Sequence, residues 1–192
     1  TAEKPQTAIR RRSVERKVPV DALYMAFHMC NRFHAEYHVF DIITDLLSNG
    51  RSSRFIQTLV QEKKLFTSID AYISGSLDEG LLHITGKPAS GITLEQAEEA
   101  VWQELDKLKT IPVAEEELEK VKNRYESEQI FNNINYLNVA TNLAFFELLG
   151  HAEDINLEVG KYRSVTVGQI QDTACRTFVP ENCNILYYKA IK

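Results

Sequence analysis

Two histidines four residues apart, in His34-Ala35-Glu36-Tyr37-His38, form the arrangement in this sequence that most resembles a metal site. On a helix His34 and His38 would share a face and could ligate zinc together. The known zinc motifs, H-E-x-x-H and H-x-x-E-H, place the glutamate directly beside a histidine. Glu36 instead lies between the two, roughly 200° round a helix from His34. Because this glutamate would point away from a metal, we predict ordinary exposed histidines and no metal site.

Other signals of catalysis are missing from the sequence. It has no G-x-S-x-G elbow, no glycine-rich phosphate loop and no Cys-His context that would activate a nucleophile. An acidic cluster at Glu115-Glu116-Glu117 and Glu119 lies at a predicted helix start, where carboxylates favour the helix dipole and face water. We therefore predict no catalytic residue in this chain.

Charge and cysteine content restrict the partners further. The net charge of −5 gives no overall attraction to phosphate backbones, so nucleic acid is not an expected partner. The one dense basic cluster, residues 10–17, is predicted to be solvated. Cys30, Cys175 and Cys183 are too few for a disulfide scaffold, and we expect buried free thiols. No apolar run approaches the ~20 residues of a membrane span, and the compartment is left open.

The stretch 47–72 carries the most specific local pattern. Asn49-Gly50 is a turn dipeptide that can take a positive φ, and Ser52 or Ser53 can then cap a helix. The apolar residues of that helix share one face, and three cations lie near its edges: Phe55, Ile56, Leu59 and Val60, with Arg54, Lys63 and Lys64. A strand at 67–73, a turn at 77–80 and a strand at 81–85 follow. This order predicts a helix that leads into a β-hairpin.

The flanking elements predict one domain. A length of 192 residues suits a single domain with a sizeable core. Residues 13–20 and 23–29 are strand-like and open a sheet, and residues 37–47 have the apolar spacing of a helix. The polar, Pro-containing residues 1–13 are typical of a remnant of an interdomain linker. We assign residues 14–192 to one domain.

The second half of the chain is predicted to be helical up to a last strand. Thr93 and Gln96 form a capping-box sequence before a long helix. Residues 114–149 are too long for one typical helix, and we predict a break at 132–135. The second helix, 136–149, is apolar nearly all round, which predicts burial against the sheet or a partner. The remaining elements are helices at 154–163 and 167–178 and a strand at 184–188. We predict an α+β fold with a mostly antiparallel sheet covered on one face by helices.

From residue 49 to 65 the chain resembles the insulinase or pitrilysin family of zinc peptidases, which includes the mitochondrial processing peptidase. The likeness begins with N-G-R-S-S-R-F at 49–55 and continues through Leu59 and Glu62 to Leu65. Further features recur in the family order: the Thr93 capping box, E-E-E-L-E-K-V-K-N at 115–123, Leu148-Leu149-Gly150, Ser164-Val165-Thr166 and Pro180-Glu181-Asn182. The match is to the second, non-catalytic half of such a peptidase.

This resemblance implies a LuxS/processing-peptidase-like metallohydrolase fold, in which two similar α+β halves close around an unfolded peptide. Zinc would be held by the N-terminal half, through an H-x-x-E-H motif and a distant glutamate, and this domain alone would hold no cofactor and be inactive. The implied partners are that catalytic half or a partner subunit and a peptide substrate, which would bind by strand addition to a sheet edge. Dimerisation is a further option.

Two residues are candidates for contacting the substrate. The family supplies an arginine and, seven residues on, a tyrosine, but these positions are Val60 and Thr67 here. We predict Arg54 and Tyr72 as replacements, because arginine can hold a carbonyl or carboxylate and tyrosine can both pack and hydrogen bond. The alternative is that Arg54 anchors the turn and Tyr72 is a half-buried strand residue. Loss of the family pair also fits a catalytically silent structural or regulatory subunit, and a third option is a stand-alone binding module that uses residues 136–149.

Overall fold

The computed structural model describes residues 6–75 and 77–191, and within these ranges the chain forms a five-stranded sheet. The strands are β1 (Arg10–Arg16), β2 (Ala22–Met29), β3 (Phe66–Ile73), β4 (Gly80–Pro88) and β5 (Cys183–Ala190). Their order across the sheet is β1-β5-β2-β4-β3. The β1/β5 pair is parallel and the other pairs are antiparallel. The predicted β3–β4 hairpin and the mostly antiparallel sheet are thus confirmed.

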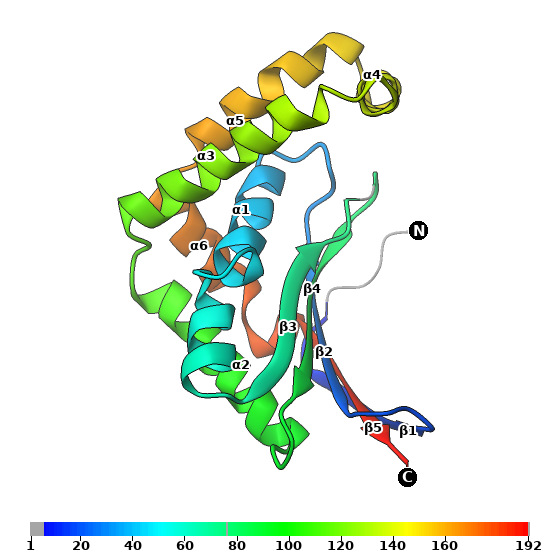
Figure 1. The fold of residues 1–192 in the computed structure, drawn as a ribbon, viewed down its shortest axis with the longest axis vertical. Helices are drawn as coiled ribbons and strands as arrows, with labels where there is room; N and C mark the ends of the chain where they lie inside the picture. Colours follow the sequence, from blue (N-terminus) through cyan, green and yellow to red (C-terminus); the bar gives the residue numbers. More distant parts are fainter. Residues whose placement is uncertain (1–5, 76, 192) are drawn as a thin grey trace.

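Helices cover one face of this sheet (Figure 1). They are α1 (Tyr37–Ser48), the π-helix η1 (Ile56–Glu62), α2 (Leu94–Thr110), α3 (Glu115–Asn132), α4 (Tyr136–Leu149), η2 (Ala152–Leu157), α5 (Glu158–Ser164), α6 (Val167–Thr177) and η3 (Pro180–Asn182). Helix α1 lies between the sheet and α3, whereas α4 lies beyond the end of the sheet. The predicted α+β class with helices on one face is therefore correct.

The core lies between the sheet and the helices. Alternate residues of β2, Leu23, Met25 and Phe27, are almost fully buried because successive side chains of a strand point to opposite faces. Phe27 packs edge-to-face on Trp102 of α2 and on Phe178, with ring centroids 5.6 and 5.1 Å apart. The alternate side chains in between point to the other face, which we call the uncovered face.

Local sequence signals account for several helix boundaries. Thr93 and Gln96 make both bonds of the predicted capping box, and Thr166 and Gln169 make a second box at the start of α6. The Asn135 side chain accepts from the backbone N–H groups of Leu137 and Asn138, so α4 is capped where the break was predicted.

The start of the sheet and the turn before η1 differ from the sequence predictions. Strand β1 starts at Arg10 rather than residue 13 because Arg10 to Arg16 pair in register with Asn184 to Ala190. Part of the predicted linker is therefore strand, and residues 1–5 lie outside the described residues. Ser53 does not cap a helix, since its hydroxyl donates to the Gly50 carbonyl oxygen at 2.7 Å. Gly50 has the expected positive φ, 94°.

Candidate functional site

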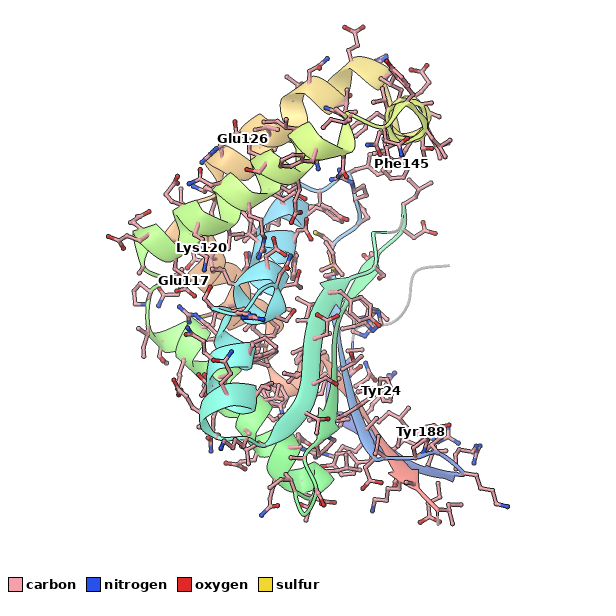
Figure 2. The ribbon with its side chains drawn as sticks, viewed as in Figure 1. Tyr24, Glu117, Lys120, Glu126, Phe145 and Tyr188 are labelled. Atoms are coloured by element: carbon pink, nitrogen blue, oxygen red, sulfur yellow. The ribbon has the colours of Figure 1, made fainter. Side chains whose placement is uncertain are left out.

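The uncovered face of the sheet carries paired aromatic side chains. Tyr72 of β3 lies opposite His83 of β4, and their rings stack with centroids 5.0 Å apart. Tyr24 of β2 and Tyr188 of β5 form an edge-to-face pair at 6.3 Å, and Figure 2 shows both on the side turned away from the helices. Partial burial lowers the pKa of His83, so its imidazole is held neutral to lower pH.

Two hollows open on this face. One, of about 380 Å³, lies over β2, β4 and β3 and is lined by Tyr24, Asp70, Tyr72, Thr85 and Lys87 among others. Aromatic walls with an acid, a base and a hydroxyl suit a peptide, whose backbone offers both donors and acceptors. The second, of about 790 Å³, lies near the start of β4 and is lined by residues that include Arg10, His28, Glu79 and Asn184.

Arg54 lies on the helical side of the molecule and is not brought together with Tyr72. Its Nε and Nη2 atoms donate to the two carboxylate oxygens of Glu117 on α3, at 2.9 and 2.8 Å. The neighbouring Ser52 hydroxyl accepts from Lys120 of the same helix. This bidentate pair ties the turn before η1 to α3, and Figure 2 shows Glu117 and Lys120 on the helical side.

The side chains of Val60 and Thr67 carry neither the positive charge nor the phenol of the family arginine and tyrosine. Val60 is half-buried and packs against the core. Thr67 is exposed at a register shift in β3, where its hydroxyl donates to the Lys87 carbonyl oxygen at 3.1 Å. Neither side chain can replace the guanidinium or phenol that the family resemblance leads one to expect.

The two edges of the sheet differ in their availability for strand addition. On β3 the Ser48 hydroxyl, from the end of α1, accepts from the Ala71 N–H at 2.9 Å and lies 3.1 Å from the Ala71 carbonyl oxygen. These backbone groups point away from β4, so Ser48 closes the middle of that edge. On β1, Arg10, Arg12 and Arg16 are exposed, as expected for the solvated basic cluster.

The histidine pair is split between two environments. His34 precedes α1 and its side chain is 53% exposed, whereas His38 is 5% exposed, so the prediction of two exposed histidines is wrong for His38. Its Nε2 atom lies 3.2 Å from Glu158 of α5, which draws the ring inward. Among residues 6–75 and 77–191, no group of three or more His, Cys, Asp and Glu side chains could hold a metal ion.

Glu158 is the centre of a buried polar cluster between α1 and α5. It accepts from Arg32 and Lys161, each at 2.7 Å, and contacts His38. Burial alone would raise the pKa of its carboxyl, but the hydrogen bonds from His38, Lys161 and Arg32 outweigh that effect and lower the pKa to about 2. Glu158 is therefore charged at neutral pH and holds α5 against α1.

Helix α4 is exposed, which contradicts the predicted burial against the sheet. Only Phe146 of this helix is buried, while Tyr136, Leu137 and Leu148 are 90, 73 and 67% exposed. We call residues 130–157 the apolar arm because further large apolar side chains on it are exposed: Ile130, Phe131, Ile134, Leu143, Phe145 and Leu157. The arm packs mainly on itself, through α4 and η2, so it has no sheet to cover. Contiguous apolar exposure of this kind marks an interaction surface.

The free thiols also differ from one another. Cys183 is buried and Cys30 is half-buried, but Cys175 is exposed on α6. The expectation of buried thiols is therefore wrong for Cys175.

No helix in the described part of the chain has the length and apolar character to span a bilayer.

The sequence pattern did not predict that Tyr24, His83 and Tyr188 lie on the same face of the sheet as Tyr72. The signal was present in strand 22–29, where Tyr24, Ala26 and His28 alternate with larger apolar residues. Such alternation predicts a second, open face. The order of the strands was also needed, because Tyr188 comes from the other end of the chain.

Comparisons with known proteins agree on the fold. A protease from Helicobacter pylori superposes with a TM-score of 0.91 at 19% identity, over 97% of this chain and 45% of that one. An inactive peptidase domain from Bordetella parapertussis gives 0.82 at 18% identity, over 93% of this chain and 97% of that one. A chain of complex III from Candida albicans gives 0.78 at 15% identity, over 94% of this chain and 45% of that one. These likenesses show a shared fold.

The chain thus spans about half the length of the Helicobacter pylori protease. No curated protein matches it. A family model described as the peptidase M16 inactive domain matches residues 1–125, which include the stretch 49–65 where the resemblance to insulinase-type peptidases begins. On this match the chain belongs to the peptidase M16 family, as one of its inactive domains.

Proposed function

We propose that this chain is the C-terminal half of an insulinase-like zinc endopeptidase and forms one wall of a chamber for unfolded peptides. The catalytic zinc would be bound by an N-terminal half, on the same chain or on a partner subunit. The observation that carries the proposal is the exposed apolar arm, residues 130–157, in a domain that corresponds to 45% of a protease of the same fold.

The arm supplies the contact with the catalytic half. Its exposed Tyr136, Leu137 and Leu148 would gain the burial that this chain does not provide. At about 25 cal/mol per Å² of apolar surface, burying several such side chains is enough to sustain a stable association. Only Glu147 is charged among residues 136–149, so desolvation of α4 costs little.

The uncovered face contributes the peptide-binding wall. Tyr72 and its neighbours around the hollow of about 380 Å³ would contact side chains and backbone of an extended substrate. Because Ser48 closes the middle of the β3 edge, strand addition would use the edge of β1. Arg54, engaged by Glu117, would hold η1 in place and act on substrate only indirectly.

A zinc and hydrolysis assay tests the proposal. The 192-residue chain alone is expected to hold no stoichiometric zinc and to leave an unstructured peptide intact. The assembled peptidase is expected to bind zinc and to cleave the peptide. In the assembled enzyme, Tyr72→Ala should raise the KM for the peptide, while Ile111→Ala, an exposed apolar residue outside the face and outside the apolar arm, serves as control. The proposal fails if the chain alone binds zinc and cleaves a peptide that its His34→Ala, His38→Ala variant cannot cut.

A second candidate is a catalytically silent subunit of a larger complex. Val60 and Thr67 at the family Arg and Tyr positions favour it, as does the shared fold with a chain of complex III from Candida albicans. The two candidates differ in the catalytic half: an intact H-x-x-E-H motif there supports the peptidase, and a degenerate motif supports the silent subunit.

A further inference from the structure

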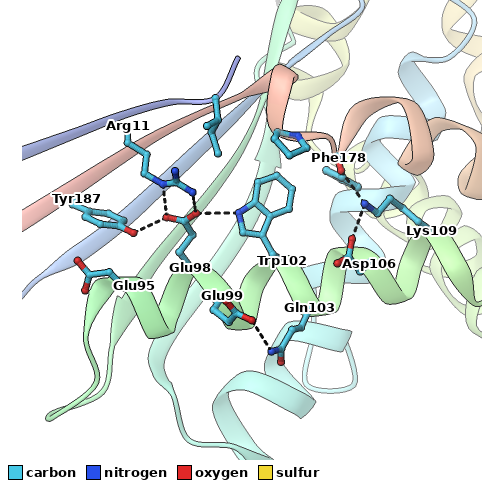
Figure 3. A pocket seen from close by; sticks show the side chains of 12 residues that line it. Arg11, Glu95, Glu98, Glu99, Trp102, Gln103, Asp106, Lys109, Phe178 and Tyr187 are labelled. Carbon is cyan, nitrogen blue, oxygen red and sulfur yellow. Dashed lines mark hydrogen bonds and ion pairs between the residues drawn. The ribbon is translucent and has the colours of Figure 1, made fainter. Parts of the chain in front are cut away.

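A groove of about 760 Å³ lies on the helical side of the sheet, away from the uncovered face (Figure 3). Helix α2 forms one wall, and Arg11 of β1 and Tyr187 of β5 form the other. Because β1 is the edge strand, an extended chain can enter the groove from solvent. Apolar side chains line its interior: Ile9, Trp102, Phe178 and Pro180.

The indole of Trp102 is held in a fixed orientation inside this groove. Its Nε1 donates to Glu98 at 3.2 Å. The same carboxylate accepts two bonds from Arg11, at 2.6 and 3.1 Å, and one from the Tyr187 hydroxyl at 2.6 Å. Figure 3 shows these bonds converging on Glu98. Glu98 is thus fully paired, and the half-buried indole is presented to the groove without rotational freedom.

The rim beside the indole is acidic. Glu95 and Glu99 lie one helical turn apart on α2 and are exposed. Neither forms an ion pair with a cation of residues 6–75 or 77–191, although Glu99 accepts from Gln103 at 3.3 Å. Asp106, further along the helix, is neutralised by Lys109 at 2.6 Å. Two uncompensated carboxylates therefore lie along α2 on the N-terminal side of the indole, Glu99 about one turn from Trp102 and Glu95 about two turns from it.

We propose that this groove binds an extended basic segment of a partner protein, with one arginine or lysine side chain beside Trp102 and Glu99 and a second beside Glu95. A tryptophan face is the strongest aromatic partner for a cation, and a nearby carboxylate pair selects cations over neutral or acidic side chains. The accessible apolar side chains of Ile9 and Pro180 accommodate an aliphatic neighbour of the basic residue. The groove lies on the helical side of the sheet, opposite the uncovered face, and none of its lining residues belongs to the apolar arm.

Trp102 is the only tryptophan of the chain and so reports occupancy directly. The 192-residue chain is titrated with the blocked peptide Gly-Ser-Arg-Leu-Arg-Ser-Gly while tryptophan emission is followed. A saturable change that weakens with added salt is expected, and the peptide with glutamate in place of both arginines should cause none. The Glu95→Gln, Glu99→Gln variant should bind the basic peptide about five-fold more weakly.

A matched control changes the same charge elsewhere. Glu115→Gln, Glu116→Gln at the start of α3 removes two exposed carboxylates outside the groove lining and should keep the affinity of the wild-type chain. Equal weakening by both double variants would show non-specific attraction and overturn the proposal. So would equal binding of the acidic peptide, or an unchanged emission while a labelled basic peptide binds.

Discussion

The sheet with its covering helices and the apolar arm contain similar apolar residues, but they bury them to opposite extents. Leu23, Phe27 and Ile84 in the sheet are fully buried, whereas Tyr136 and Leu148 on the arm are 90 and 67% exposed. The first region is stabilised by contacts within this chain. The second gains little from them, and we propose that contacts with a second half explain its composition. The apolar content of a segment thus shows that its surface requires burial. It does not show whether the same chain or a partner protein buries that surface.

The largest expected effect comes from the core side of this comparison. Phe27→Ala removes a fully buried ring that packs on Trp102 and Phe178, and should lower the free energy of unfolding by about 3–5 kcal/mol. Leu137→Ala on the arm, 73% exposed, should change it by at most about 0.5 kcal/mol. Urea unfolding of the 192-residue chain measures both. Similar losses for the two variants would remove the distinction between the regions.

The cluster around Glu158 lies where the two regions meet, and acid should weaken it. Because folding lowers the pKa of Glu158 from 4.5 to about 2, its contribution is fully present above pH 4.5 and is lost as the pH falls towards 2. Glu158→Gln should cost about 3 kcal/mol at neutral pH, since Arg32 is left buried without its anion.

The pH dependence supplies the check on this prediction. The free energy of unfolding, measured from pH 7 to 2, should fall less steeply below pH 4.5 in Glu158→Gln than in the wild-type chain. Glu153→Gln, an exposed carboxylate of the arm, is the control and should keep the wild-type slope. Parallel curves for Glu158→Gln and wild type would contradict the assignment.

A smaller effect separates the two predicted substrate contacts. Arg54→Ala breaks a partly buried bidentate pair with Glu117 and should cost about 1 kcal/mol of stability. Tyr72→Ala should cost about 0.5 kcal/mol, because its ring is 46% exposed and stacks only on His83. Thermal unfolding measures both losses. In the assembled peptidase the order should reverse for peptide affinity, and a larger affinity loss for Arg54→Ala would restore it as a substrate contact.

The smallest effect on stability is expected on the arm, where the effect on assembly should be greatest. Leu137→Glu with Leu148→Glu should leave the free energy of unfolding within about 0.5 kcal/mol of wild type. The same change should abolish association with the catalytic half, because two carboxylates would be buried without partners. Co-purification of the two halves gives the readout, with Glu115→Lys as a surface control on α3. Full retention of association would place the interface elsewhere.

Short-range signals predicted the fold well. The Thr93 capping box, the Asn49-Gly50 turn and the β3–β4 hairpin follow from residues close in the chain, and all three are present. The β1/β5 pairing joins residues at opposite ends of the chain, so nothing local revealed that β1 starts at Arg10. The inward position of His38 likewise depends on Glu158, which is 120 residues away.

The candidate site was harder to predict than the fold. Tyr72 was predicted as a substrate contact from its place on a strand, and that role stays a prediction, whereas identifying its stacking partner His83 required the register of the hairpin. Arg54 is an arginine and so suits substrate binding, but in the structure its guanidinium is paired with Glu117. This pairing depends on how α3 packs against the turn before η1, which the sequence does not reveal. Helix α4 was correctly predicted as apolar, yet an all-round pattern does not distinguish burial against the sheet from burial against a partner, and the structure excludes only the sheet.

Amide hydrogen exchange of α4 tests the central claim most directly. It is measured on the 192-residue chain alone and on the assembled peptidase, with α1 as an internal reference because most of its residues are buried within this chain. The amides of Tyr136–Leu149 are predicted to exchange rapidly in the chain alone and to become strongly protected in the assembly. Rapid exchange of α4 in both samples, with α1 protected throughout, would contradict the account.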